Sequence, residues 1–89
     1  MPTRKEIKQR VIEKIAAVID EPVSAVSETD KLWEKFGMGP TVRRAMALPY
    51  SKIALSYEGG RAVSQADAEK QQTVKTSIDL VTSRAQGKA

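Results

Sequence analysis

The chain has 89 residues and a net charge of +4, from 15 Lys and Arg against 11 Asp and Glu. This length predicts a single domain with one modest hydrophobic core. The chain contains no Cys and no His, which excludes disulfides, thiolate metal sites and the commonest metal ligand and general base. We therefore expect no enzymatic activity, no catalytic residue and no bound metal.

The positive charges are spread along the chain, which indicates a solvated surface rather than the clustered patch of a nucleic-acid interface. No apolar run approaches the roughly 20 residues that a membrane helix needs. The first six residues lack the apolar core of a signal peptide. These features predict a cytoplasmic monomer that does not enter a membrane.

The first predicted helix begins after Thr3, which has capping-box spacing to Glu6. Apolar residues then recur at helical intervals, at Ile7, Val11, Ile12, Ile15, Val18 and Ile19. Pro22 ends the helix, because the residue before a proline is forced out of the helical region. Residues 23–29 are predicted to form a loop with one turn near its start.

The segment from residue 30 to residue 41 holds the only Trp and the only Phe. We expect Asp30 to cap a short helical turn and Gly37 to close it in a left-handed conformation. Trp33 is interpreted as a core anchor, because a small core needs the large buried area of an indole. Gly39 as N-cap and Pro40 as first residue then predict the start of a second long helix.

Pro49 interrupts this second helix, since a proline in a helix interior removes one backbone hydrogen bond. The sequence predicts either a kink at Leu48 or two pieces, residues 40–48 and 49–57. The Gly59-Gly60 pair is the clearest break in the chain. It is only a weak candidate for a phosphate-binding loop, because no strand precedes it and no Lys-Ser/Thr follows it.

Two further helices are predicted near the C-terminus. Ser64 has capping spacing to Asp67 and opens a short helix, and Thr73 opens the last helix. The apolar face of the last helix is formed by Val74, Ile78 and Val81. We assign residues 1–84 to one domain and expect residues 85–89 to be a disordered tail. No alternating apolar pattern predicts a strand, so the expected fold class is all-α.

This order of elements resembles an acyl carrier protein, over roughly residues 5–82. That family has a valine in the first loop, then an aromatic residue, a leucine and a glycine ahead of a modified serine. The corresponding positions here are Val26, Leu32, Phe36 and Gly37. Near the C-terminus, residues 62–74 match the family's short acidic helix and the Thr-Val that opens its last helix, and residues 78–81 fit that helix. The resemblance implies a small four-helix bundle with a long first loop and a short third helix.

The same resemblance implies that the attachment site is lost. In the family, 4′-phosphopantetheine is esterified to a serine hydroxyl. Counting from Gly37 places Pro40 at that position, and one inserted residue would place Thr41 there. The segment before Val63 is about five residues longer than the family pattern, and an insertion before the second helix would place Ala45 at the site. We therefore expect no cofactor, unless a divergent carrier is modified at Thr41. Ser51 is a free hydroxyl nearby, but it is too close to Val63 to fit the family register.

Family members present an acidic second helix to basic patches on their enzymes, whereas this helix is basic. We assign partner contacts to Arg43, Arg44, Met46 and Lys52 and expect a protein partner with an acidic surface. The sequence thus favours a carrier-like binding module without phosphopantetheine. Two alternatives remain: a divergent carrier modified at Thr41, and a small basic module in which residues 40–57 form a helix-turn-helix on nucleic acid.

Overall fold

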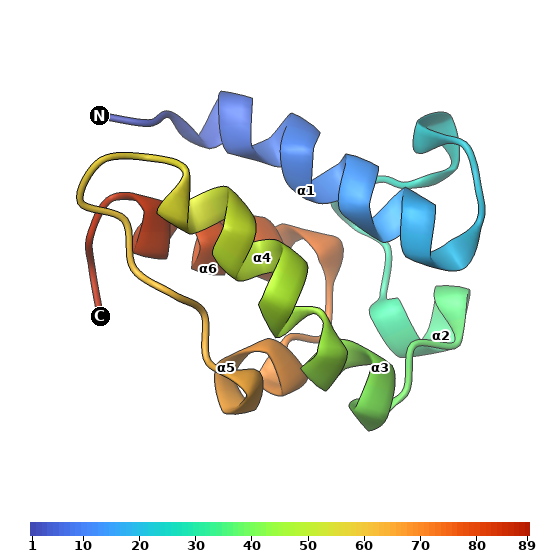
Figure 1. Cartoon of the computed structure of the whole chain (residues 1–89). Coiled ribbons are helices and arrows are strands. Elements are labelled where there is room, and N and C mark those ends of the chain that lie inside the picture. Colours follow the sequence, from blue (N-terminus) through green and yellow to red (C-terminus); the bar gives the residue numbers. More distant parts are fainter.

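Six α-helices and one 3₁₀ turn make up the computed structural model, which describes residues 1–89 (Figure 1). They are α1 (Arg4–Ile19), η1 (Val23–Ala25), α2 (Leu32–Phe36), α3 (Pro40–Ala45), α4 (Ala47–Leu55), α5 (Gln65–Lys70) and α6 (Val74–Ala85). The chain forms a compact all-α globule without strands, as predicted, and α1, α4 and α6 are its long helices. No helix is both long and apolar enough to cross a membrane.

The predicted ends of the first helix are confirmed. The Thr3 hydroxyl accepts a hydrogen bond from the Glu6 backbone N–H at 3.3 Å and caps the start of α1. At the other end, Asp20 adopts the left-handed conformation with φ 56°. The predicted turn in the following loop is η1. The helix α1 therefore ends before Glu21, the residue whose helical conformation is disfavoured by Pro22.

A cluster of charges at the start of α1 fixes the long loop. The Arg4 guanidinium donates to the carboxylates of Glu28 at 2.6 Å and Asp79 at 2.7 Å, and Lys8 reaches Glu28 at 3.0 Å. The hydrogen bond from Arg4 is the largest of the effects that lower the pKa of Glu28 to about 2. These contacts join α1, the loop and α6 at the surface, where such pairs contribute modestly to stability.

Asp30 does not cap α2, which corrects the prediction. Its carboxylate accepts the Ser27 backbone N–H at 2.8 Å and the Lys35 ammonium at 3.1 Å. The Ser27 contact is the main reason why the pKa of Asp30 is lowered. Lys31 occupies the N-cap without a side-chain hydrogen bond, and the Leu32 N–H bonds instead to the Gln72 carbonyl at 2.9 Å.

The second long helix divides at Met46, before the predicted break. Both predicted alternatives placed the discontinuity at Leu48 and Pro49, but Pro49 lies in the first turn of α4. There its missing N–H costs no intrahelical bond, since the first N–H groups of a helix have no such partner. A break before Pro49 also relieves the clash of its ring with the carbonyl four residues earlier, that of Ala45.

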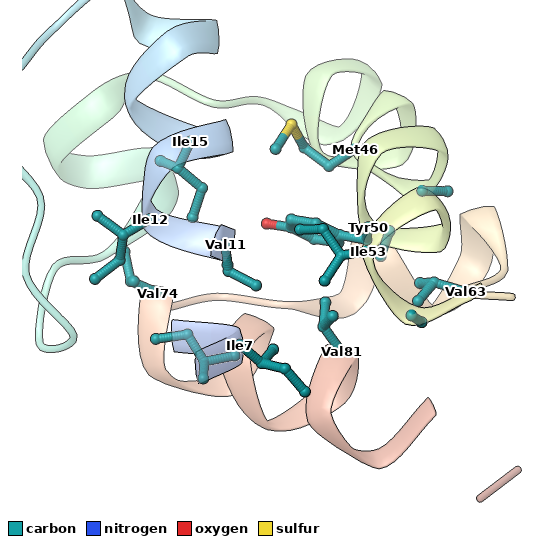
Figure 2. Packing of buried hydrophobic residues seen from close by; sticks show 14 of the residues in the cluster. Ile7, Val11, Ile12, Ile15, Met46, Tyr50, Ile53, Val63, Val74 and Val81 are labelled. Carbon is teal, nitrogen blue, oxygen red and sulfur yellow. The ribbon is translucent and has the colours of Figure 1, made fainter. Parts of the chain in front are cut away.

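The core lies where α1, α4 and α6 meet (Figures 1 and 2). Figure 2 shows Tyr50 extending from α4 toward α1, where Val11 and Ile15 face it. Val81 reaches the same region from α6 (Figure 2). Most of the residues predicted to form the apolar faces of the first and last helices are buried. They are Ile7, Val11, Ile12, Ile15, Val74, Ile78 and Val81. Val18 is exposed, and Ile19 only partly buried.

The predicted C-terminal boundary at residue 84 falls inside α6. Ala85 is buried, and the Arg61 N–H donates to the Arg84 carbonyl at 2.8 Å. The Gln86 side-chain amide donates to the Pro2 carbonyl at 3.1 Å, and the Lys88 N–H bonds to the Ser83 carbonyl. These contacts join residues 85–88 to the domain, whereas the sequence predicts a disordered tail from residue 85.

Tyr50 carries the one buried side-chain polar atom without a hydrogen-bond partner. Burial raises the pKa of Tyr50 to about 12, and the nearby Ser77 hydroxyl offsets this rise only in part. Ser77 itself donates to the Thr73 carbonyl at 3.0 Å. Burial therefore removes the hydrogen bonds between the Tyr50 hydroxyl and water, and no protein group replaces them with adequate geometry. An unpaired hydroxyl in a core lowers the stability of the fold.

We predict that Tyr50→Phe stabilises the fold by about 1 kcal/mol at neutral pH, because it removes this unpaired hydroxyl. Between pH 10 and 12 the unfolded wild type releases the Tyr50 proton while the folded protein keeps it. Wild-type stability should therefore fall through this window by on the order of 2 kcal/mol from this residue, and the variant should lack that fall. Urea unfolding at a series of pH values measures both effects. If the stability of the two proteins changed in parallel between pH 10 and 12, the raised pKa of Tyr50 would be contradicted.

Candidate functional site

The turn between α2 and α3 is built as the sequence predicts. Gly37 adopts the left-handed conformation with φ 67° and closes α2. Met38 points into the core, and its N–H bonds to the Leu32 carbonyl at 3.0 Å. Gly39 is then the N-cap of α3, and Pro40 is its first residue. The turn therefore places the start of α3 at the surface.

The residues proposed as attachment positions occupy different environments. Pro40 opens α3 and has no hydroxyl, and Ala45 ends the same helix. Thr41 is exposed, and its hydroxyl makes no hydrogen bond within the chain. Ser51 was expected to be free, but its hydroxyl donates to the Val63 carbonyl at 3.1 Å and accepts the Val63 N–H at 2.9 Å. Only Thr41 therefore offers an accessible hydroxyl.

Arg43 is fixed by backbone carbonyl groups and is only partly exposed. Its Nε donates to the Glu69 carbonyl at 3.0 Å, and its Nη1 donates to the Met38 carbonyl at 2.7 Å. The next residue, Arg44, pairs with the Glu69 carboxylate at 3.0 Å. Two of the cations assigned to partner contacts thus also hold α3 against α5.

The other two predicted partner contacts differ in exposure. Met46 is 2 % exposed and belongs to the core, so its assignment to a partner surface is wrong. Lys52 is exposed on α4 and has no carboxylate within ion-pair distance. Lys52 is the predicted contact residue that is most available to a partner.

Two leucines on α4, which the sequence prediction did not single out, are exposed. Leu48 is 65 % exposed and Leu55 is 54 % exposed. They lie seven residues apart, so they share one side of the helix with Lys52 between them. We call Leu48, Lys52 and Leu55 the outer face of α4. The outer face lies opposite the buried residues of α4, which are Ala47, Tyr50, Ile53 and Ala54, so the spacing of these apolar residues could have indicated it.

The segment of chain that carries this face has charges of one sign. Residues 40–57 contain Arg43, Arg44 and Lys52 and no Asp or Glu. Arg44 is paired with the Glu69 carboxylate, whereas Arg43 and Lys52 have no carboxylate partner. These two unneutralised charges favour an acidic group on a partner.

Trp33 is not a core anchor, which corrects the prediction. Its side chain is 56 % exposed and contacts the backbone of the turn beside Gly39. A pocket of about 300 Å³ lies there, lined by Trp33, Pro40, Arg43 and Gln72. Trp33 lies in the short α2, where Leu32 is the buried residue, so the indole remains at the surface. The sequence placed Trp33 just before the predicted start of the second helix, but it could not show that a pocket lies there.

The two carboxylates of α5, Asp67 and Glu69, are each paired with an arginine. Asp67 accepts the Arg84 guanidinium at 3.0 Å and the pKa of Asp67 is lowered, mainly by this contact, whereas Glu69 binds Arg44. No group of three or more carboxylates is placed to hold a metal ion.

Comparison of the chain with family models, curated proteins and solved structures finds no match.

Proposed function

We propose that the chain is a carrier-protein-like binding module that has no phosphopantetheine attachment site and docks on an acidic surface of a protein partner. The observation that carries this proposal is the outer face of α4, two exposed leucines around an unpaired lysine within a segment free of carboxylates. Exposed apolar side chains at helical spacing are typical of helix-mediated recognition.

The order of the helices supports the carrier-like part of the proposal. A long α1 and loop, a divided second helix, the short α5 and the capped α6 follow the order that the resemblance implies. Pro40 stands at the first position of the second helix, where the resemblance places the modified serine. Because proline has no hydroxyl, a phosphopantetheine ester cannot form at this residue.

The intact mass after co-expression with a phosphopantetheinyl transferase tests the missing attachment site. We expect the mass of the unmodified chain, because no serine is present at the start of α3. A carrier protein that has the acceptor serine, expressed with the same transferase, serves as the positive control. A mass increase of one phosphopantetheine group would contradict the proposal.

Docking is tested with two variants of equal net charge, Lys52→Glu and Lys14→Glu, each immobilised beside the wild type. Both lysines are exposed, but Lys14 lies on α1, outside the carboxylate-free segment. We expect a partner retained by the wild type and by the Lys14 variant to be lost with Lys52→Glu and with raised salt. Equal retention by both variants would exclude the outer face of α4.

A divergent carrier modified at Thr41 is the second candidate function, and one observation favours it. Thr41 is exposed at the second position of α3, and its hydroxyl is unengaged. If an adduct does form in the mass experiment, Thr41→Ala should abolish it. An adduct that persists in this variant would exclude Thr41 as the acceptor.

The nucleic-acid alternative has less support. A helix-turn-helix joins its helices through a turn of three to four residues, whereas α3 and α4 are joined by Met46 alone. Arg43 and Arg44 also hold α3 against α5, and the charge of Arg44 is paired with the Glu69 carboxylate, so few cations of this segment are available to phosphates. Binding to duplex DNA at low salt would revive this alternative.

A further inference from the structure

The pocket beside the α2–α3 turn presents an aromatic wall to solvent. More than half of the Trp33 side chain is accessible, although an indole is among the largest apolar groups a small core could bury. The ring lies beside Gly39, since a Cβ at that position would be in van der Waals contact with it at 3.4 Å. Pro40 continues the wall, and Gln72, whose side-chain amide donates to the Lys70 carbonyl at 3.4 Å, completes the lining from the segment before α6. A planar apolar group could stack on this wall.

Arg43 gives the pocket a fixed positive charge. Its Nε and Nη1 are each held by a backbone carbonyl, so the guanidinium is ordered before any ligand arrives. No carboxylate lines the pocket, and the nearby Glu69 carboxylate is paired with Arg44 at 3.0 Å. The remaining N–H groups of Arg43 form no hydrogen bond within the chain. A preorganised cation beside an apolar wall favours an anionic group, because little ordering cost remains on binding.

We propose that this pocket binds a small aromatic carboxylate, with the ring stacked on Trp33 and the carboxylate held by Arg43 and Gln72. The volume of about 300 Å³ is at the lower end of ligand pockets and suits a single ring with a short acidic arm. This chemistry occurs in free aryl acids and in an aromatic residue at the C-terminus of a peptide. The site is separate from the outer face of α4, and it does not depend on the docking function.

Trp33 is the only Trp, so its fluorescence reports directly on the pocket. Phenylacetate and N-acetylphenylalanine are the two probes, and N-acetylphenylalanine amide is the neutral control. Both acids should change the emission saturably, with an affinity on the order of 1 mM for ligands of roughly 10 to 15 non-hydrogen atoms. The amide should bind about tenfold more weakly or not at all, because it lacks the charge-assisted bonds. Tighter binding of phenylacetate would identify a free acid, and tighter binding of N-acetylphenylalanine a peptide end.

Three variants locate the binding. Gln72→Ala should weaken both acids about threefold, and Arg43→Lys should weaken them about tenfold because the planar fork is lost. Lys52→Gln lies outside the pocket and should leave the affinity unchanged while it impairs docking. Circular dichroism checks that each variant is folded, and Gln72→Ala still tests the site if Arg43→Lys unfolds. An absence of saturable change, an equal response to the neutral amide, or wild-type affinity in both pocket variants would overturn the proposal.

Discussion

Gly60→Ala is expected to destabilise the domain by about 3 kcal/mol or more, because a Cβ at this position has no space. It would lie 1.9 Å from the Ala54 carbonyl oxygen and 3.0 Å from the Tyr57 carbonyl oxygen. Both atoms belong to the backbone around the end of α4, so the strain cannot be relieved by a side-chain rotation. Thermal unfolding should shift downward by roughly 15 °C in a domain of this size.

The neighbouring glycine is the matched control. A Cβ at Gly59 would meet no atom within 4 Å, but Gly59 has φ 79°. Gly59→Ala should therefore cost about 1 kcal/mol, the strain of a left-handed alanine. Equal losses for the two variants would show that the loop can move away from α4. The close packing of the backbone at Gly60 also explains why a Gly-Gly sequence occurs here. A phosphate-binding site is not needed to account for these two glycines.

Ile53→Ala is expected to lose about 3 kcal/mol, whereas Leu55→Ala should lose less than about 0.5 kcal/mol. The two residues are close in α4, but Ile53 is fully buried and Leu55 is 54 % exposed. Removing Ile53 leaves a cavity among α1, α4 and α6, while removing Leu55 exposes no core. Urea unfolding followed by circular dichroism measures both losses.

This comparison bears directly on the proposed function. If Leu55→Ala and Leu48→Ala retain the stability of the wild type, both leucines can be removed to test docking without disturbing the fold. A large loss of stability in Leu55→Ala would show that Leu55 supports the core, and the outer face of α4 would lose one of its apolar residues. Ile53→Ala serves as the positive control for such a loss.

Local signals in the sequence predicted most of the helix boundaries. Thr3, Ser64 and Thr73 each cap the helix they were expected to cap, with side-chain hydrogen bonds to the third residue that follows. Gly37 and Gly39 take their expected places at the α2–α3 turn. These features could be read from the chain because a cap is a contact between residues a few positions apart.

The candidate site was predicted only in part, because its contacts join residues that are far apart in the sequence. Arg43 and Arg44 were placed in the basic second helix, but their contacts with Glu69 cross 26 and 25 positions of sequence. The same holds for Ser51, whose hydroxyl bonds to the backbone of Val63. A pattern within one helix shows which side chains lie on a face, and it does not show which other element covers that face.

The sequence by itself determined the all-α class, the helix caps, the cation-only segment and the proline at the start of the second helix, since each depends on residue identity and short-range spacing. Only the tertiary structure decided that Trp33 lies at the surface, that Met46 is buried and that the helix divides at Met46 rather than at Pro49. These outcomes depend on how α2, α3 and α4 pack against the rest of the chain. Burial is set by that packing, so a large apolar residue can remain outside a core that other side chains already fill.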